Sequence, residues 1–427
     1  MANIIPFRAV RPRADLAEKI AALPYDVYSR EEAREAVKGD EFTFLRIDRP
    51  ETQFPEKYDM YAPEVYEKAA EMLQQMIEDG FFIQEEKAAY YVYELVMDGR
   101  SQVGIGACAS VDDYDNRVIK KHENTRADKE ADRIRHVDVC SAQTGPIFLA
   151  YRRKEEIERE VKRAMSGPPV YDFTADDQIT HRLWVIDEEE AVSRIRAAFL
   201  QVEDIYIADG HHRCASAVRV SRKRRAAFPN YTGKEEFNYF LSVLFPDDQL
   251  MIMDYNRVVK PGEDFDGSTF LEKVGRSFQM EKRGKEPYRP KRKGEIGMYY
   301  QNDWYRLTIN NECYTGDPVG DLDVAVLQKY LLEPVFGIAD PKVDERIDFV
   351  GGIRGLKELE RRVHTDATVA FAMFPTDIHE LFAVSDAGKL MPPKSTWFEP
   401  KLRSGLLIHR IEREGQRAAD DVSGDGK

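Results

Sequence analysis

A short apolar run that ends in a dense polar turn is the feature of this sequence that most constrains the fold. The run Asp204-Ile205-Tyr206-Ile207-Ala208 predicts a buried strand, and residues 211–224 predict a helix directly after it. Between them the chain reads Asp209-Gly210-His211-His212-Arg213, a segment that we name the 209–213 turn. A chain that passes from strand to helix in so few residues must turn tightly, and Gly210 permits such a turn.

The 209–213 turn predicts an anion site. The first N–H groups of a helix and its dipole attract negative charge. His211, His212 and Arg213 add hydrogen-bonding or cationic side chains, and arginine can contact a phosphate in bidentate fashion. Asp209 would repel a bare phosphate, which leaves three roles open: a Mg²⁺ ligand, a partner that orients a histidine, or the helix N-cap. The alternative for the whole turn is a capped helix with exposed histidines.

The length of 427 residues predicts more than one domain. Strands and helices are mixed without strict alternation, so the expected fold class is α+β (mixed α/β). Residues 282–293 are rich in Lys, Arg, Gly and Pro, which indicates a surface connection near a boundary. We therefore expect a nucleotide-binding catalytic region over residues 1–280, a C-terminal α+β region over 281–413, and a polar, disordered tail over 414–427.

Composition excludes several classes of protein. The net charge of −14 disfavours broad electrostatic binding to nucleic acid. No apolar run approaches the ~20 residues of a spanning helix, and no export signal is recognisable, so we expect a cytoplasmic protein without a membrane partner. Neither a P-loop nor a dinucleotide fingerprint is present, and the four cysteines form no CxxC pair. Nothing in the sequence indicates the oligomeric state.

A second polar segment precedes a predicted helix over residues 123–139. Phosphoryl transfer needs positive charge around the phosphates and a carboxylate near the attacking hydroxyl. Glu123 can supply the carboxylate, with His122 beside it. Four basic residues can supply the charge: Lys121, and, at helical spacing on one face, Arg126, Lys129 and Arg133. The alternative is a solvated helix whose acidic residues neutralise these bases.

Other segments offer candidate substrate contacts. Asp26 lies in Pro24-Tyr25-Asp26-Val27, and Thr125 follows the His-Glu pair, although Thr125 is also suited to capping a helix. A Pro-Pro segment stiffens the loop that carries Lys394, Ser395 and Thr396, all of which can donate hydrogen bonds to an anion. A loop turn at Asp26 and a rigid crossing loop at 391–396 are the structural alternatives.

These motifs resemble those of known families. The strand, the 209–213 turn and the helix together resemble the nucleotide-phosphate motif of the ParB/sulfiredoxin-like superfamily, most closely its form in archaeal ADP-dependent free-serine kinases. Over most of its length the chain is similar to the family called domain of unknown function 1015. The motifs that carry this similarity are Ile5-Pro6-Phe7-Arg8, Pro24-Tyr25-Asp26-Val27, Lys121-His122-Glu123-Asn124-Thr125, Ala208 to Arg213, and Met391-Pro392-Pro393-Lys394-Ser395-Thr396.

The resemblance implies a ParB/sulfiredoxin-like nucleotide-binding core with large insertions. It implies a kinase that uses ADP or ATP with Mg²⁺ to phosphorylate a free amino acid hydroxyl, L-serine giving O-phospho-L-serine. Glu123 would then accept the proton of the serine hydroxyl, with His122 and Asp209 as further catalytic residues. The other implied class is a ParB-like nucleotide-binding regulator or nucleic-acid-associated protein without kinase activity.

Overall fold

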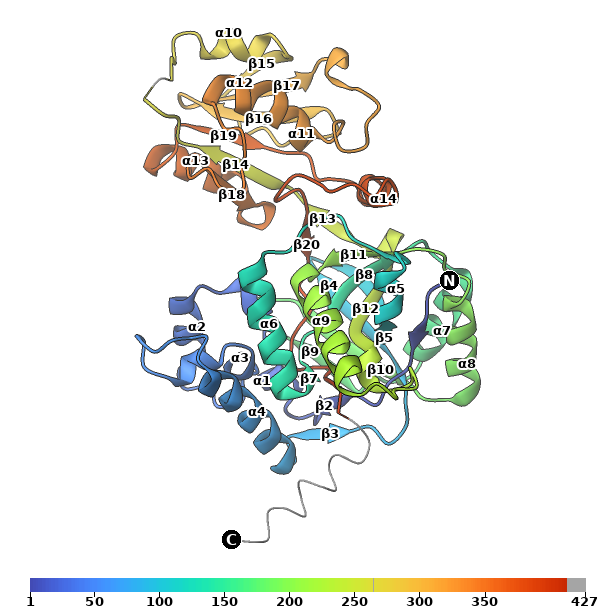
Figure 1. Cartoon of the computed structure of the whole chain (residues 1–427). Coiled ribbons are helices and arrows are strands. Elements are labelled where there is room, and N and C mark those ends of the chain that lie inside the picture. The colour runs from blue at the N-terminus through green and yellow to red at the C-terminus, as the bar shows by residue number, and fades with distance from the viewer. Residues whose placement is uncertain (264, 413–427) are drawn as a thin grey trace. The chain divides into compact units, whose positions relative to one another are not determined.

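The chain forms two compact units in this computed structural model, which describes residues 1–263 and 265–412. The first unit contains Met1–Lys120, Asn124–Leu250 and the described residues from Pro400 onward. The second contains Lys121–Glu123 and Met251–Glu399 (Figure 1). The boundary expected at 280/281 therefore lies at 250/251 instead, and the chain returns to the first unit at Pro400. The tail predicted over 414–427 lies outside the described residues.

The first unit is built on a mixed sheet, which confirms the expected α+β class. In the described part of the chain this sheet has nine strands, ordered β6-β11-β8-β12-β5-β4-β10-β9, with β1 paired to β5. The pairs β11–β6 and β12–β8 are parallel and the others antiparallel. The strands are β1 (Ile4–Ile5), β4 (Tyr90–Met97), β5 (Arg100–Ser110), β6 (Ile119–Lys120), β8 (Ile147–Tyr151), β9 (Tyr171–Thr174), β10 (Thr180–Ile186), β11 (Ile205–Asp209) and β12 (Tyr239–Pro246).

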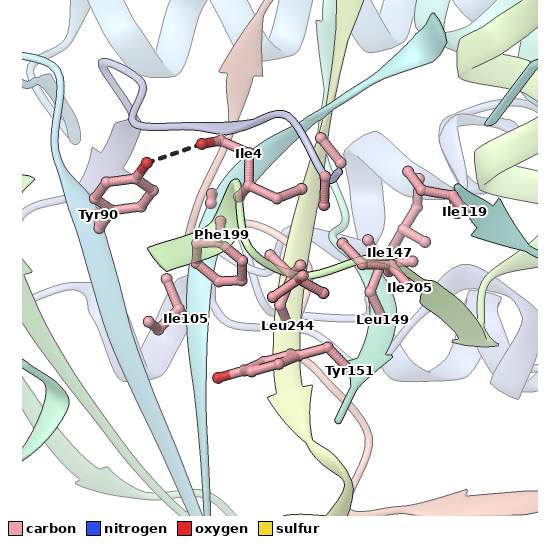
Figure 2. Close-up of a cluster of buried hydrophobic side chains, with 14 of the residues drawn as sticks. Ile4, Tyr90, Ile105, Ile119, Ile147, Leu149, Tyr151, Phe199, Ile205 and Leu244 are labelled. Carbon is pink, nitrogen blue, oxygen red and sulfur yellow. Dashed lines mark hydrogen bonds between the residues drawn. The ribbon is translucent and has the colours of Figure 1, made fainter. Parts of the chain in front are cut away.

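The central strands of this sheet are buried along most of their length, as their nearly continuous apolar sequences require. Figure 2 shows the main core, in which aliphatic side chains from β5, β8, β11 and β12 pack around the rings of Tyr151 and Phe199. The hydroxyl of Tyr90 satisfies its hydrogen bond by donating to the carbonyl oxygen of Ile4 at 2.9 Å. Because β11 is embedded in this core, its C-terminal end at Asp209 has a fixed position.

The helices expected over residues 123–139 and 211–224 are present as Ala127–Cys140 and His211–Ala227. Near the N-terminus, Ser29 and Glu32 form a capping box at the start of α2. The side chains of α7 and α8 pack into the same core as those of α9, while α9 also packs on α6 and α6 on α4. The helices are α1 (Ala17–Ile20), α2 (Arg30–Ala36), α3 (Leu45–Asp48), α4 (Pro63–Glu78), α5 (Val111–Asp115), α6 (Ala127–Cys140), α7 (Glu155–Met165), α8 (Glu189–Phe199) and α9 (His211–Ala227).

The second unit is a separate antiparallel sheet, ordered β15-β17-β16-β19-β14-β18. Helix α13 packs on it through the buried Leu359. Its strands are β14 (Tyr255–Val259), β15 (Phe278–Gly284), β16 (Glu295–Tyr300), β17 (Asp303–Ile309), β18 (Ile347–Gly351) and β19 (Val369–Ala372), with β13 (Met251–Met253) and β20 (Trp397–Glu399) paired separately. Its helices are α10 (Phe270–Gly275), α11 (Asp323–Leu327), α12 (Glu333–Phe336), α13 (Leu356–Thr365) and α14 (Ile378–Asp386). The basic segment at 282–293 begins in the exposed edge strand β15. Because an exposed edge strand is rich in charged residues, its composition is similar to that of a linker.

The chain re-enters the first unit through a segment, residues 400–411, that we name the return segment. Its strand β21 (His409–Arg410) pairs with β7 (Ala142–Gln143), and Ser404 forms a bridge with Ala22. Arg403 is buried, forms an ion pair with Asp177, and donates from Nε to Nε2 of His181 at 3.2 Å. The return segment is therefore held by backbone and side-chain contacts from Arg403 onward. Near the N-terminus, β2 (Val10–Pro12) pairs with β3 (Phe82–Gln84).

We expect His181 to make the first unit sensitive to acid. Burial, and then the charge of Arg403, lower the pKa of His181 to about 3. Since the unfolded chain has the ordinary pKa near 6.5, it takes up the proton first as the pH falls. His181 therefore does not affect the free energy of unfolding above about pH 6.5. Between about pH 6.5 and pH 3 it lowers this free energy progressively, by about 3 kcal/mol at pH 4.

The measurement is the free energy of unfolding in urea at pH 7 and pH 4, for the wild type and His181→Gln. The difference between the two pH values should be smaller in the variant by about 3 kcal/mol, because glutamine does not titrate. An equal pH dependence in both proteins would contradict the prediction.

In the part of the chain that the structure describes, no helix combines the length and the apolar character needed to cross a membrane. All four cysteines are buried and free of disulfides.

Candidate functional site

The 209–213 turn joins the end of β11 to the start of α9, as the sequence predicted. Gly210 is the N-cap residue and has a φ of 90°, in the left-handed region that glycine adopts most readily. The helix begins with the N–H of Cys214 donating to the carbonyl oxygen of Gly210 at 2.9 Å. Because glycine has no side chain, the N-cap residue places no capping oxygen over the first-turn amides. The end of the helix therefore keeps the polarity that attracts an anion.

Asp209 is held by two partners in the first unit. Its Oδ1 accepts the N–H of Gly210 at 2.7 Å, and its Oδ2 lies 3.1 Å from Nζ of Lys401. Burial would raise the pKa of Asp209, but the ion pair with Lys401 and the charge of Arg213 outweigh it and hold the pKa well below its usual range. The carboxylate is therefore ionised and partly neutralised by Lys401. Of the three roles left open, the N-cap is wrong, because Gly210 occupies that position.

Arg213 lies against two glycines. Its Nη1 donates to the carbonyl oxygen of Pro146 at 2.6 Å. A Cβ atom at Gly210 would lie 3.1 Å from Nε of Arg213, and one at Gly145 would lie 3.4 Å from Nη1. Gly210 thus leaves space that the guanidinium fills, whereas a side chain at Gly145 would only reach ordinary contact with it. The half-buried side chain is oriented before any ligand arrives, which lowers the entropy cost of a bidentate contact.

His212 acts as a neutral side chain. Its Nε2 accepts the backbone N–H of Arg126 at 3.0 Å, so the ring proton is carried by Nδ1. Burial lowers the pKa of His212, while the negative charge of Asp26 opposes this shift. Near neutral pH this histidine therefore offers a hydrogen-bond donor rather than a positive charge. His211 is buried at the first position of α9.

Residues predicted near the turn from separate parts of the sequence do gather around it. Asp26 is exposed in a short 3₁₀ turn, Tyr25–Val27, and its charge acts on His212. The charge of the exposed Lys129 acts on the same ring. Thr125 donates from its hydroxyl to Glu130 at 2.8 Å. The structure thus brings Asp26 and the start of α6 to the 209–213 turn, as is required if these segments contribute to one site.

The predicted basic face of α6 is wrong. Arg133 is buried, forms an ion pair with Asp132 at 2.9 Å, and packs its guanidinium 4.1 Å from the ring centre of Tyr25. Arg126 is the N-cap residue, outside the helix, and its exposed side chain is paired with Asp128. The ring of Tyr25 and the half-buried carboxylate of Asp132 offset the desolvation of Arg133. Helical spacing alone did not reveal this burial. Lys129 keeps the exposed position expected of it.

A cavity of about 30 Å³ borders Arg213. Its volume suits about two water molecules and is too small for a nucleotide. The polar lining comes from Tyr25, Asp48, Arg133, His136, Gln143, Thr144, Arg213 and Ser404.

The remaining predicted residues belong to the second unit. Lys121 and Glu123 are exposed, and the carbonyl oxygen of the buried His122 accepts the N–H of Met391 at 2.8 Å. This bond brings the His-Glu segment and the 391–396 loop together.

Within that loop, the hydroxyl of Ser395 donates to the carbonyl oxygen of Pro392 at 2.6 Å. Lys394 has a φ of 57°, and its Nζ lies 5.6 Å from the ring centre of Tyr255. Thr396 is half-buried. The contacts of Ser395 and Lys394 favour the structural alternative for this loop.

Sequence reasoning missed Lys401, whose Nζ lies 3.1 Å from Oδ2 of Asp209. Asp209 and Lys401 are separated by 192 positions in the chain. Only the path of the return segment brings them together, and the sequence around Lys401 carries no local signal for it. Pro146 and Gly145 were also missed as contacts of Arg213.

Comparisons with solved structures give only distant similarities. A free serine kinase variant in complex with ADP is 12% identical, with 71% of this chain and 92% of that chain covered and a TM-score of 0.36. SbnI from Staphylococcus aureus, with a C-terminal truncation, is also 12% identical, with 74% and 93% covered and a TM-score of 0.37. A conserved hypothetical protein from Pyrococcus furiosus is 13% identical, with 71% and 94% covered and a TM-score of 0.34. Similarity this low assigns no function.

Comparisons of sequence are more decisive about the family. No curated protein matches the chain. The family described as "Protein of unknown function (DUF1015)" matches residues 4–325, which is most of the sequence. The chain belongs to this family.

Proposed function

We propose that this protein is a small-molecule kinase that transfers a phosphoryl group from ADP or ATP to the hydroxyl of a free amino acid, with L-serine as the acceptor. The observation that carries the proposal is the 209–213 turn. A glycine-capped helix start, an oriented arginine and a neutral histidine donor stand together at the end of one buried strand. Preorganised donors of this kind stabilise a phosphate as it gains charge during transfer.

The chemical roles in this proposal are divided among a few residues. The α9 amides, Arg213 and His212 bind the phosphates of the nucleotide. Glu123 is the proposed base that accepts the proton of the acceptor hydroxyl, on the strength of the sequence resemblance. Asp26, exposed beside His212, is a proposed contact for the acceptor. An amino acid carries a cationic ammonium group, which suits a carboxylate there.

Mg²⁺ belongs to the proposed reaction as the ion that neutralises charge on the phosphates. Asp209 was the predicted protein ligand for it. Since Oδ1 accepts the N–H of Gly210 and Oδ2 is paired with Lys401, this carboxylate already has partners on both oxygens. The arrangement favours Mg²⁺ that is held chiefly by the oxygens of the nucleotide itself.

A nucleotide-binding regulator that contacts nucleic acid is the second candidate, and it would need a basic surface, for which the run at 222–225 is a candidate segment. Each of these four side chains is now paired with an acidic residue of the first unit: Arg222 with Asp115, Lys223 and Arg224 with Asp138, and Arg225 with Asp112. Neutralised charges attract a polyanion weakly. The pairing therefore favours the kinase over the regulator.

The test is incubation of the purified full chain with L-serine, Mg²⁺ and either ADP or ATP. O-phospho-L-serine is identified by mass spectrometry and ³¹P NMR, and D-serine and L-alanine serve as acceptor controls. The proposal expects O-phosphoserine with one of the two nucleotides and with L-serine only. Nucleotide binding without any phosphorylated amino acid, together with retention of duplex DNA in a shift assay, would favour the regulator instead.

A further inference from the structure

We propose that Lys401 is a phosphate-binding residue of the same site, and that Asp209 holds its ammonium in place until the anion arrives. The inference rests on the proposed binding of a phosphate at the 209–213 turn. It adds a residue that lies far from the turn in sequence and a chemical role for the Asp209 carboxylate.

The first support is position. Nζ of Lys401 lies 3.1 Å from Oδ2 of Asp209, whose Oδ1 accepts the N–H of Gly210. The ammonium is thus linked through one carboxylate to the residue that caps α9. An anion received by the first-turn amides would lie beside both Lys401 and Arg213. The side chain of Lys401 is 18% exposed, so solvent screens its charge less than that of a surface lysine.

The second support is rigidity. Two residues after Lys401, the buried Arg403 is held by Asp177 and His181. The backbone N–H of Ser404 donates to the carbonyl oxygen of Ala22 at 2.8 Å, and that of Gly405 donates to the carbonyl oxygen of Thr144 at 3.1 Å. These contacts hold the return segment in place next to Lys401. Binding of an anion by Lys401 therefore does not carry the entropy cost of ordering a free loop.

The third support is charge. An ionised carboxylate at an anion site is unfavourable unless a cation offsets it. Lys401 supplies this cation in the absence of a ligand. When a phosphate binds, its oxygens offer the ammonium charge-assisted hydrogen bonds in addition to the one it makes with Asp209. Because an ammonium has three N–H donors, Lys401 can bond to the carboxylate and to the phosphate at the same time.

The experiment compares Lys401→Met with Lys401→Arg and Lys120→Met in the full chain. Lys120 is a matched control, because its Nζ lies 2.9 Å from Oδ2 of Asp204 and the pair has similar exposure, 20% and 29%. Asp204 precedes the other end of β11, about 17 Å from Asp209 at ~3.3 Å per residue. Calorimetric titrations use four probes: ADP, ATP, adenosine and inorganic pyrophosphate. Thermal melts report whether each variant is folded.

We expect Lys401→Met to weaken binding of ADP and pyrophosphate by at least about 10-fold, the value of one charge-assisted hydrogen bond. Binding of adenosine should not change, Lys401→Arg should restore most of the loss, and Lys120→Met should bind like the wild type. Unchanged ADP and pyrophosphate binding in Lys401→Met, or an equal loss for adenosine, would overturn the inference.

The probes also separate this inference from the kinase proposal. If the wild type binds pyrophosphate but neither ADP nor ATP, the kinase proposal fails, and the pyrophosphate titrations still decide the role of Lys401. If the wild type binds ADP but Lys401→Met binds it equally well, the role of Lys401 fails while the kinase proposal stands. If the wild type binds no probe, both are overturned.

Discussion

Replacing Glu123 with glutamine is expected to lower the rate of O-phosphoserine formation by about 10²- to 10⁴-fold, the usual contribution of a general base. Glutamine has nearly the same shape as glutamate, but its amide does not accept a proton from the hydroxyl that attacks the phosphate. Glu123 is exposed, and the carbonyl oxygen of the preceding His122 is bonded to the N–H of Met391. The substitution should therefore leave the backbone of this segment unchanged.

The measurement is single-turnover formation of O-phosphoserine, combined with a calorimetric titration of the nucleotide. Nucleotide affinity should remain within about twofold of the wild type, because the base contacts the acceptor and not the donor. Glu312→Gln is a suitable control, since Glu312 is an exposed acidic residue of the same unit. Turnover by Glu123→Gln at the wild-type rate would remove Glu123 from the role of base.

Local signals in the sequence were sufficient to predict the framework of the site. The apolar run before Asp209, the glycine at 210 and the periodicity of residues 211–224 predicted β11, the turn and α9, and all three are present. The pair Asp98-Gly99 between β4 and β5 is likewise a sequence typical of a two-residue hairpin turn, and both residues have the positive φ of such a turn. Each of these features depends on residues within a few positions of one another.

Features that depend on the path of the chain were not predictable in this way. Lys401 reaches Asp209 only because the chain leaves the first unit at Leu250 and returns at Pro400. The charged sequence of α6 indicated a solvated face, yet Arg133 is buried because Tyr25, far away in sequence, covers its guanidinium. No local pattern reports either contact. The sequence around the 209–213 turn therefore predicts the turn itself, whereas the contacts of Lys401 and Tyr25 depend on the path of the whole chain.

Replacing Arg213 with methionine is expected to weaken ADP binding by about 100-fold, since two charge-assisted hydrogen bonds to the phosphates would be lost. Arg213→Lys should recover only part of this loss, because a lysine keeps the charge but not the planar pair of donors. The matched control is Arg222→Met on the same helix, where the exposed arginine is paired with Asp115. Calorimetric titration of ADP measures the effect, and thermal melting checks the fold.

A variant that leaves Arg213 itself intact tests whether its orientation matters. A Cβ atom at Gly210 would lie 3.1 Å from Nε and 3.3 Å from Nη2 of Arg213, so Gly210→Ala should displace the guanidinium from its place beside Pro146. We expect a loss of ADP affinity at least as large as that of Arg213→Lys, at unchanged net charge, and thermal melting checks that the variant is folded. If Gly210→Ala binds ADP like the wild type while Arg213→Met does not, the arginine contributes charge alone, and the preorganised fork would have to be abandoned as the basis of phosphate binding.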